Sequence, residues 1–172
     1  MKCPLAAIDL GTNTTRLLIG CIEPDGRIRQ LTLKRCITRL GGGFSRERGI
    51  SDEARERTVA ALQDFAAEIR RQEVARVQAV ATSAVRDAVN GKEFCEDIFQ
   101  KTGIRLDIID GQKEGLLTLR GVLAGLDQRP ENLMVFDVGG GSTEYTLTAG
   151  DTPLFTMSLP LGVVMSRSGT HR

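Results

Sequence analysis

Two short loops in this sequence carry an aspartate, glycines and hydroxyl residues at matching positions. The first is IDLGTNTT at 8–15 and the second is FDVGGGST at 136–143, and each joins two apolar, strand-like runs. Glycines let backbone amides approach an anion closely, and successive amides form a nest for phosphate oxygens. A carboxylate beside a phosphate is repulsive unless a cation lies between them. The two loops therefore predict binding of a phosphate chain and a divalent metal, and we expect them to share one cleft.

The chemistry of each side chain suggests its role in these loops. Asp9, Asp137 and Glu144 are the candidate metal ligands, because hard carboxylate oxygens suit Mg²⁺, with Mn²⁺ as the alternative. For Glu144, the alternative is a solvent-facing strand glutamate. The candidate phosphate-binding residues of the loops are Gly11, Thr12, Asn13, Thr14, Gly139, Gly140, Gly141 and Ser142.

The two loops also align as an internal repeat. When AIDLGTNTTRLLI (7–19) is set over VFDVGGGSTEYTL (135–147), the aspartates, the first glycines and the hydroxyl residues fall in register. We interpret this match as two related structural units that each contribute one loop.

The rest of the chain supplies the elements that position the loops. Strands are expected at 4–10, 16–23, 28–39, 76–82, 104–110, 132–138, 143–149 and 153–159, and helices after Ser51, at 91–102 and at 112–126. This order predicts an α/β fold with a mixed sheet. The run Asp127-Gln128-Arg129-Pro130 predicts a first domain at 1–126, a linker at 127–131 and the start of a second domain at 132–172.

The composition is that of an ordinary globular protein, with 172 residues, 41% hydrophobic residues and a net charge of +1. No global field attracts nucleic acid or a membrane surface, and neither partner is expected. The only histidine, His171, argues against a histidine-ligated metal and against a Ser–His–Asp triad. No apolar run approaches membrane-spanning length, so the expected location is cytoplasmic.

Six motifs together resemble the exopolyphosphatase and guanosine pentaphosphate phosphatase family over nearly the whole chain. Besides the two loops, they are RLG at 39–41, ATSAVRDAVN at 81–90, IIDGQKEG at 108–115 and SLPLGVV at 158–164. The resemblance implies the actin-like ATPase superfold, with a ribonuclease-H-like N-terminal domain followed by the first strands of a second, similar domain. Family members are longer than this chain, so the second domain is expected to be truncated and the full-length form to be a homodimer.

The resemblance also implies a reaction. It is hydrolysis of the terminal phosphoanhydride bond of inorganic polyphosphate, or removal of the 5′ phosphate of pppGpp. Glu114 matches the glutamate of the family motif and is the candidate general base; the alternative is an acid that the helix N-terminus favours.

Two arginines are further phosphate-binding candidates. Arg86 lies in an expected loop after the strand at 76–82, where a guanidinium can bind a phosphate bidentately. Its alternative is a surface arginine paired with Asp87. Arg39 precedes a leucine and three glycines and is a similar candidate.

Three other functions fit the same sequence features. One is a kinase of the same fold, which transfers the phosphate to an acceptor instead of water. Another is a nucleotide-gated ATPase of the chaperone or actin type. The third is a regulatory module that binds pppGpp or polyphosphate without turnover.

Overall fold

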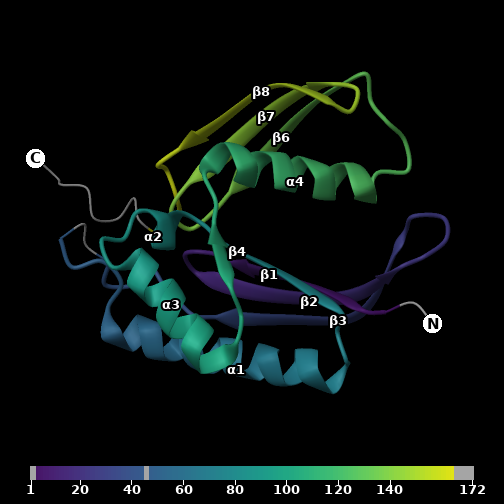
Figure 1. Cartoon of the computed structure of the whole chain (residues 1–172). Coiled ribbons are helices and arrows are strands. Elements are labelled where there is room, and N and C mark those ends of the chain that lie inside the picture. The colour runs from purple at the N-terminus through teal and green to yellow at the C-terminus, as the bar shows by residue number, and fades with distance from the viewer. Residues whose placement is uncertain (1–2, 45–46, 165–172) are drawn as a thin grey trace, which may run out of the picture. The chain divides into compact units, whose positions relative to one another are not determined.

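The computed structural model describes residues 3–44 and 47–164 of the chain. The chain divides into two compact units between Ile108 and Ile109. The first unit contains a five-stranded sheet and the second a three-stranded sheet (Figure 1). Within the described ranges, no helix combines the length and the apolar character needed to cross a membrane.

The five-stranded sheet of the first unit is mixed, as the sequence predicts. Its strands are β1 (Leu5–Leu10), β2 (Thr14–Ile22), β3 (Ile28–Ile37), β4 (Arg76–Ala81) and β5 (Leu106–Ile108), in the order β3-β2-β1-β4-β5. The first three strands form an antiparallel meander, whereas β4 runs parallel to β1 and β5 runs parallel to β4.

The helices of the first unit are α1 (Asp52–Arg71), α2 (Ser83–Arg86) and α3 (Gly91–Thr102). The Ser51 hydroxyl caps α1 by accepting a hydrogen bond from the Ala54 amide at 3.3 Å. Gly103 ends α3 in the left-handed conformation, with φ at +74°. Both helix ends were predicted correctly from these residues. The α2 helix was not predicted, because four residues are too few for a helical hydrophobic pattern.

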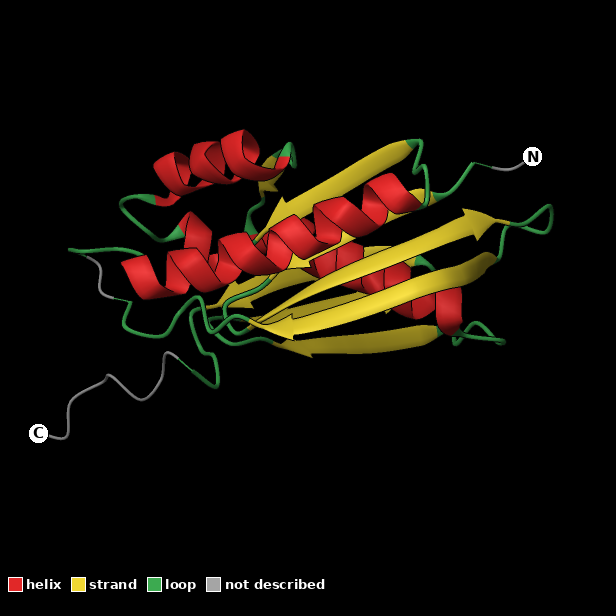
Figure 2. Cartoon of the chain, turned by 90° about the horizontal axis from the view of Figure 1, so that it is seen from below, coloured by secondary structure: helices red, strands yellow, loops and turns green. Residues whose placement is uncertain are grey.

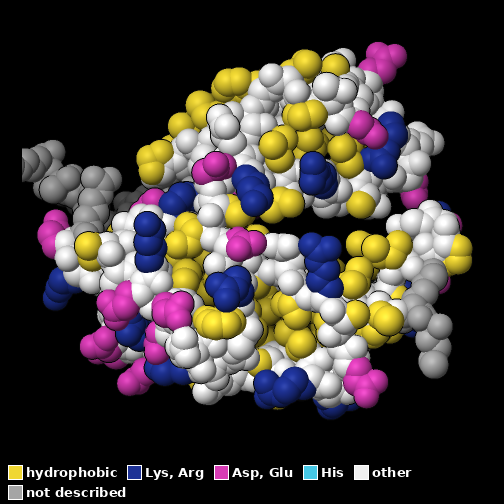
Figure 3. Space-filling view, viewed as in Figure 1, with side chains coloured by type: hydrophobic (Ala, Val, Ile, Leu, Met, Phe, Trp, Pro, Cys, Tyr) yellow, Lys and Arg dark blue, Asp and Glu magenta, His cyan; other side chains and the backbone are white. Residues whose placement is uncertain are grey.

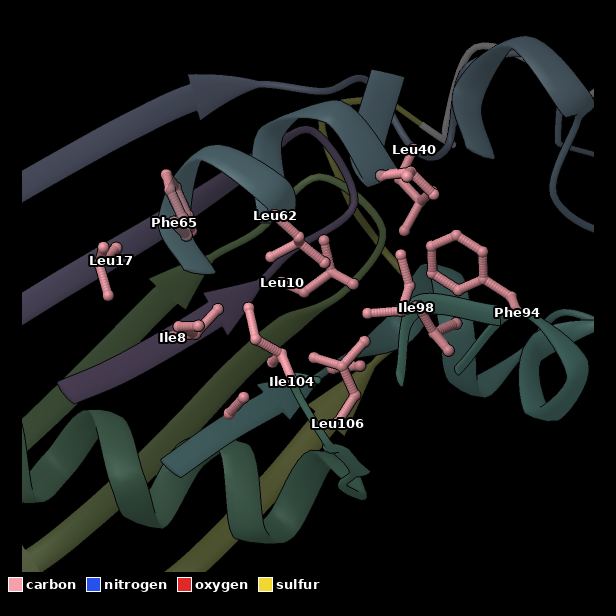
Figure 4. Close-up of a cluster of buried hydrophobic side chains, with 14 of the residues drawn as sticks. Ile8, Leu10, Leu17, Leu40, Leu62, Phe65, Phe94, Ile98, Ile104 and Leu106 are labelled. Atoms are coloured by element: carbon pink, nitrogen blue, oxygen red, sulfur yellow. The ribbon is translucent and has the colours of Figure 1, made fainter. Parts of the chain in front are cut away.

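The core of the first unit lies between one face of the sheet and helices α1 and α3 (Figures 1 and 2). Leu62 and Phe65 of α1 meet alternate side chains of β1, among them Ile8, as Figure 4 shows. This alternation follows from the period of two in a strand. Phe94 of α3 extends the same cluster, and Phe65 and Phe94 are both completely buried.

The second unit consists of an antiparallel meander and one long helix. The elements are α4 (Gly111–Gly125), β6 (Asn132–Val138), β7 (Thr143–Ala149) and β8 (Thr152–Leu159). The α4 helix packs on one face of the sheet, where Leu119 and Leu123 bury Val135. On the other side, Phe136 and Phe155 are exposed. Figure 3 shows exposed apolar side chains over these strands, and charged side chains of both signs interspersed over the first unit.

The division between the units falls before α4, whereas the sequence predicts a boundary after this helix, at 127–131. The physical reason is the fit of α4 to the second sheet. An added Cβ on Gly115 would lie 2.8 Å from Thr156 Cγ2 of β8. The helix and this strand thus lie so close together that a side chain at position 115 would displace its neighbours. The leucines of α4 show an apolar face but do not indicate which sheet that face covers.

Candidate functional site

The two predicted phosphate loops have the same backbone hydrogen bond. The Gly11 amide donates to the Thr14 carbonyl at 3.1 Å, and the Gly139 amide donates to the Ser142 carbonyl at 2.9 Å. In both loops, a Cβ on the glycine would lie 3.0 Å from the acceptor oxygen. The internal repeat seen in the sequence is therefore also a repeat of backbone geometry.

The residue opposite the aspartate differs between the loops. Asp9 lies opposite Arg16, whose Nη1 donates to Asp9 Oδ2 at 3.1 Å. Asp137 instead lies opposite Glu144. Directly opposite side chains of an antiparallel pair share one face, and like charges there are destabilising. The acidic pair of the second loop therefore fits a cation, whereas an arginine already neutralises the aspartate of the first.

Glu144 is buried in the second unit, with 1% of its surface exposed. Its Oε1 accepts a hydrogen bond from Ser158 Oγ at 2.7 Å, whereas Oε2 has no hydrogen-bond partner within the described residues. The alternative of a solvent-facing glutamate is therefore wrong. An unpartnered buried carboxylate oxygen is costly, and a cation would satisfy it.

The α4 helix brings Glu114 to the end of the second sheet that carries Asp137. Thr118 Oγ1 donates to Asp137 Oδ2 at 2.7 Å. Glu114 lies four residues before Thr118, so the two side chains occupy the same side of the helix on neighbouring turns. Asp110 caps the helix, because its Oδ1 accepts a hydrogen bond from the Lys113 amide at 2.7 Å. The cap and the threonine contact fix the helical turn that carries Glu114.

In the first unit, α2 lies against the first loop. The hydroxyls of Thr12 and Ser83 are 2.8 Å apart and form a buried hydrogen bond. Arg86 ends α2, and its Nε lies 3.4 Å from Asp87 Oδ1. This contact is the ion pair expected from the alternative reading of Arg86. The short helix nevertheless places the arginine one turn after a residue that contacts the loop.

Arg39 adopts a left-handed backbone conformation, with φ at +49°. Its amide donates to the Asn13 carbonyl of the first loop at 3.0 Å. From the other side, Arg57 Nε of α1 donates to the Thr38 carbonyl at 3.0 Å. Strained backbone persists where neighbouring contacts fix it, and it clusters at functional sites. These contacts fix the backbone of Arg39 beside the first loop, and the binding of phosphate by its guanidinium stays a prediction.

The structure groups the candidate residues into two sets, one in each unit. In the first unit they are Asp9, the loop at 11–14, Arg39 and Arg86; in the second they are Glu114, Asp137, the loop at 139–142 and Glu144. Across residues 3–44 and 47–164, no three His, Cys, Asp or Glu side chains form a group that could hold a metal. Asp9 belongs to the first unit, whereas Asp137 and Glu144 belong to the second, so a metal site shared by all three stays a prediction.

Three hydroxyl residues form hydrogen bonds with candidate site residues but were not predicted from the sequence. They are Ser83, Thr118 and Ser158. Ser83 and Ser158 lie within the motifs ATSAVRDAVN and SLPLGVV, so a hydroxyl inside a recognised motif was an available signal. Thr118 carries no such signal, because its contact depends on how α4 packs.

A model of the Ppx/GppA phosphatase family matches residues 22–168 of the sequence. The chain belongs to this family. The resemblance inferred from the six motifs is therefore confirmed, and so is the α/β actin-like fold.

Two proteins with solved structures are similar to this chain over almost its whole length. An exopolyphosphatase from Cytophaga hutchinsonii has 30% identity and a TM-score of 0.89, covering 98% of this chain and 54% of that one. The family member from Aquifex aeolicus has 33% identity and a TM-score of 0.82, covering 95% and 53%. The chain thus spans about half the length of these relatives.

A curated relative joins a phosphatase to another activity. It is a bifunctional 3-dehydroquinate synthase/phosphatase from Fusobacterium nucleatum, 36% identical, and the match covers 83% of this chain and 22% of that protein. The matched part is therefore a small fraction of a much longer relative.

Proposed function

We propose that this Ppx/GppA chain hydrolyses terminal phosphoanhydride bonds, in inorganic polyphosphate or at the 5′ phosphate of pppGpp. The observation that carries the proposal is the pair of matched loops. The amides of Thr12, Asn13, Gly140 and Gly141 donate no hydrogen bond to the described residues, so they are available to phosphate oxygens. Membership in a phosphatase family and the exopolyphosphatase among its relatives support the same chemistry.

In the proposed reaction, water attacks the terminal phosphorus and gives a proton to the Glu114 carboxylate. The bond from this phosphorus to the bridging oxygen breaks, and its electron pair stays on the oxygen of the shortened chain. The products are inorganic phosphate and a substrate that is one phosphate shorter. Loop amides and the guanidinium groups of Arg39 and Arg86 would offset the charge on the phosphoryl oxygens.

We further propose that Asp137 and Glu144 hold Mg²⁺, or Mn²⁺ in its place. The buried Oε2 of Glu144 and the acidic pair across β6 and β7 supply hard oxygen donors of the kind these ions prefer. A bound ion would neutralise charge on the transferred phosphoryl group. Asp9, whose carboxylate contacts Arg16, stays a metal ligand only as a prediction.

Asp137→Asn should raise the Mg²⁺ concentration needed for half-maximal phosphate release by about tenfold or more, because one anionic oxygen is lost. Asparagine keeps an oxygen that can accept the hydrogen bond from Thr118. Phosphate release measured against free Mg²⁺ gives the result. The matched control is Asp151→Asn, an exposed aspartate of the same unit, which should leave the requirement unchanged. If the parent protein keeps full activity in excess chelator, the metal proposal is wrong.

Arg39→Gly and Arg39→Ala should weaken tripolyphosphate binding by similar factors, because both remove the guanidinium. Glycine accepts a positive φ without the Cβ penalty, so the glycine variant should be more stable than the alanine variant by about 1 kcal/mol. Calorimetric titration measures the affinity and urea unfolding measures the stability. Parent-like affinity in both variants would show that Arg39 does not bind phosphate.

Phosphate release from polyphosphate and from pppGpp, each supplied at equal concentration, tests the function and identifies the preferred substrate. We expect release from at least one of them, and release from neither would contradict the proposal. A cytoplasmic location and a homodimeric full-length form stay predictions, which cell fractionation and sedimentation can check.

A further inference from the structure

In each unit, the segment that follows the third strand of the meander donates backbone hydrogen bonds to the phosphate loop. In the first unit this supporting segment is 39–42, where the Gly41 amide donates to the Thr12 carbonyl at 2.8 Å. In the second unit it is 161–164, where the Val163 amide donates to the Gly139 carbonyl at 3.1 Å. The repeat therefore extends beyond the loops to the segments that support them.

The supporting segments engage carbonyl oxygens of the loops. Besides the two bonds above, the Asn13 carbonyl accepts from the Arg39 amide at 3.0 Å, and the Gly140 carbonyl accepts from the Val164 amide at 2.9 Å. A carbonyl oxygen repels phosphate, whereas an amide attracts it. Holding the carbonyls on the supporting segments thus leaves the loop amides for the anion.

In each supporting segment a glycine follows a leucine and touches the loop. An added Cβ on Gly41 would lie 2.5 Å from Thr12 Cγ2, a side-chain atom. An added Cβ on Gly162 would lie 2.3 Å from the Gly140 carbonyl oxygen and 2.4 Å from the Gly141 nitrogen. The first contact can be relieved by a change of side chain, but the second is with backbone and cannot.

The second supporting segment has one further anchor. Thr143 Oγ1, at the start of β7, donates to the Leu161 carbonyl at 2.5 Å. This bond fixes the residue just before Gly162, and neither its donor nor its acceptor is a backbone group of the loop at 139–142. It offers a way to loosen the segment while leaving both glycines in place.

We infer that Gly41 and Gly162 are positioning residues that set the orientation of the two phosphate loops. This inference rests on the proposed function, since it assumes that the loops bind phosphate. A side chain at either position would push the supporting segment away from the loop. The carbonyls of that loop would then lose their hydrogen-bond donors, and the amides of the same loop would no longer point toward a bound anion.

The test measures tripolyphosphate affinity by calorimetry and melting temperature by circular dichroism on the whole chain. Gly162→Ala should weaken affinity at least about tenfold, and Gly41→Ala by a smaller factor of about three, because displacement of binding groups is costly. The matched control is Gly121→Ala on α4, where an added Cβ meets nothing within 4 Å. This variant should keep the parent affinity.

Rescue separates positioning from a general loss of stability. Thr12→Ser combined with Gly41→Ala removes the methyl group that clashes and keeps the hydroxyl that contacts Ser83, so affinity should return to within about twofold of the parent. If Gly162→Ala does not fold, Thr143→Val provides the second variant, since it keeps the side-chain shape and removes only the bond to Leu161. It should weaken affinity about threefold with the fold retained.

The outcomes separate this inference from the proposed function. A parent chain that does not bind tripolyphosphate overturns both. A parent that binds, together with folded Gly162→Ala and Thr143→Val variants of unchanged affinity, overturns the inference alone. Loss of affinity in Gly41→Ala that Thr12→Ser restores supports it.

Discussion

Glu114→Gln should lower the rate of phosphate release at least about a hundredfold while tripolyphosphate affinity changes little. Glutamine keeps the size and the hydrogen-bonding reach of glutamate but cannot take a proton from water. Asp110, and not Glu114, caps α4, so we expect the substitution to leave the fold intact. Initial rates at saturating substrate and a separate binding titration give the two quantities.

The control for this substitution is Glu131→Gln, an exposed glutamate of the same unit. It should keep the parental rate. Near-normal turnover in Glu114→Gln would remove Glu114 from the role of base. Equal losses of rate and affinity would instead indicate that the glutamate acts in substrate binding.

Phe65→Ala should destabilise the first unit by about 3–5 kcal/mol, the cost typical of deleting a fully buried aromatic side chain. The Phe65 side chain of α1 is completely buried against the sheet of the first unit (Figure 4). Phe155→Ala is the matched control, because this ring is 51% exposed on β8, and its cost should stay below about 1 kcal/mol. Urea unfolding followed by circular dichroism measures both changes. Similar costs for the two substitutions would contradict the packing of the first unit.

Much of the fold could be predicted because its signals are local. Ser51 before two acids marks the start of α1, and Gly103 marks the end of α3. The register of the two loops follows from matched aspartates and glycines, such as Gly11 and Gly139. Each of these features depends on a few consecutive residues, so the sequence shows it directly.

The remaining features depend on contacts between distant residues. The packing of α4 on the second sheet follows from the close approach of Gly115 to Thr156, which no run of residues shows. The burial of Glu144 depends in the same way on β7 and α4 together. The strand pattern alone allowed a solvent-facing glutamate. The candidate residues can thus be identified from their residue types, whereas their hydrogen-bond partners can be identified only from the packing of the folded chain.

In the proposed reaction, water accepts the terminal phosphoryl group. The most direct test of this step incubates the chain with Mg²⁺ and polyphosphate or pppGpp in ¹⁸O-labelled water, and then analyses the released phosphate by mass spectrometry. We predict inorganic phosphate carrying one ¹⁸O atom and a substrate shortened by one phosphate. Phosphate transferred to an added acceptor would indicate a kinase instead. Binding of substrate with no labelled phosphate released from either compound would contradict the account.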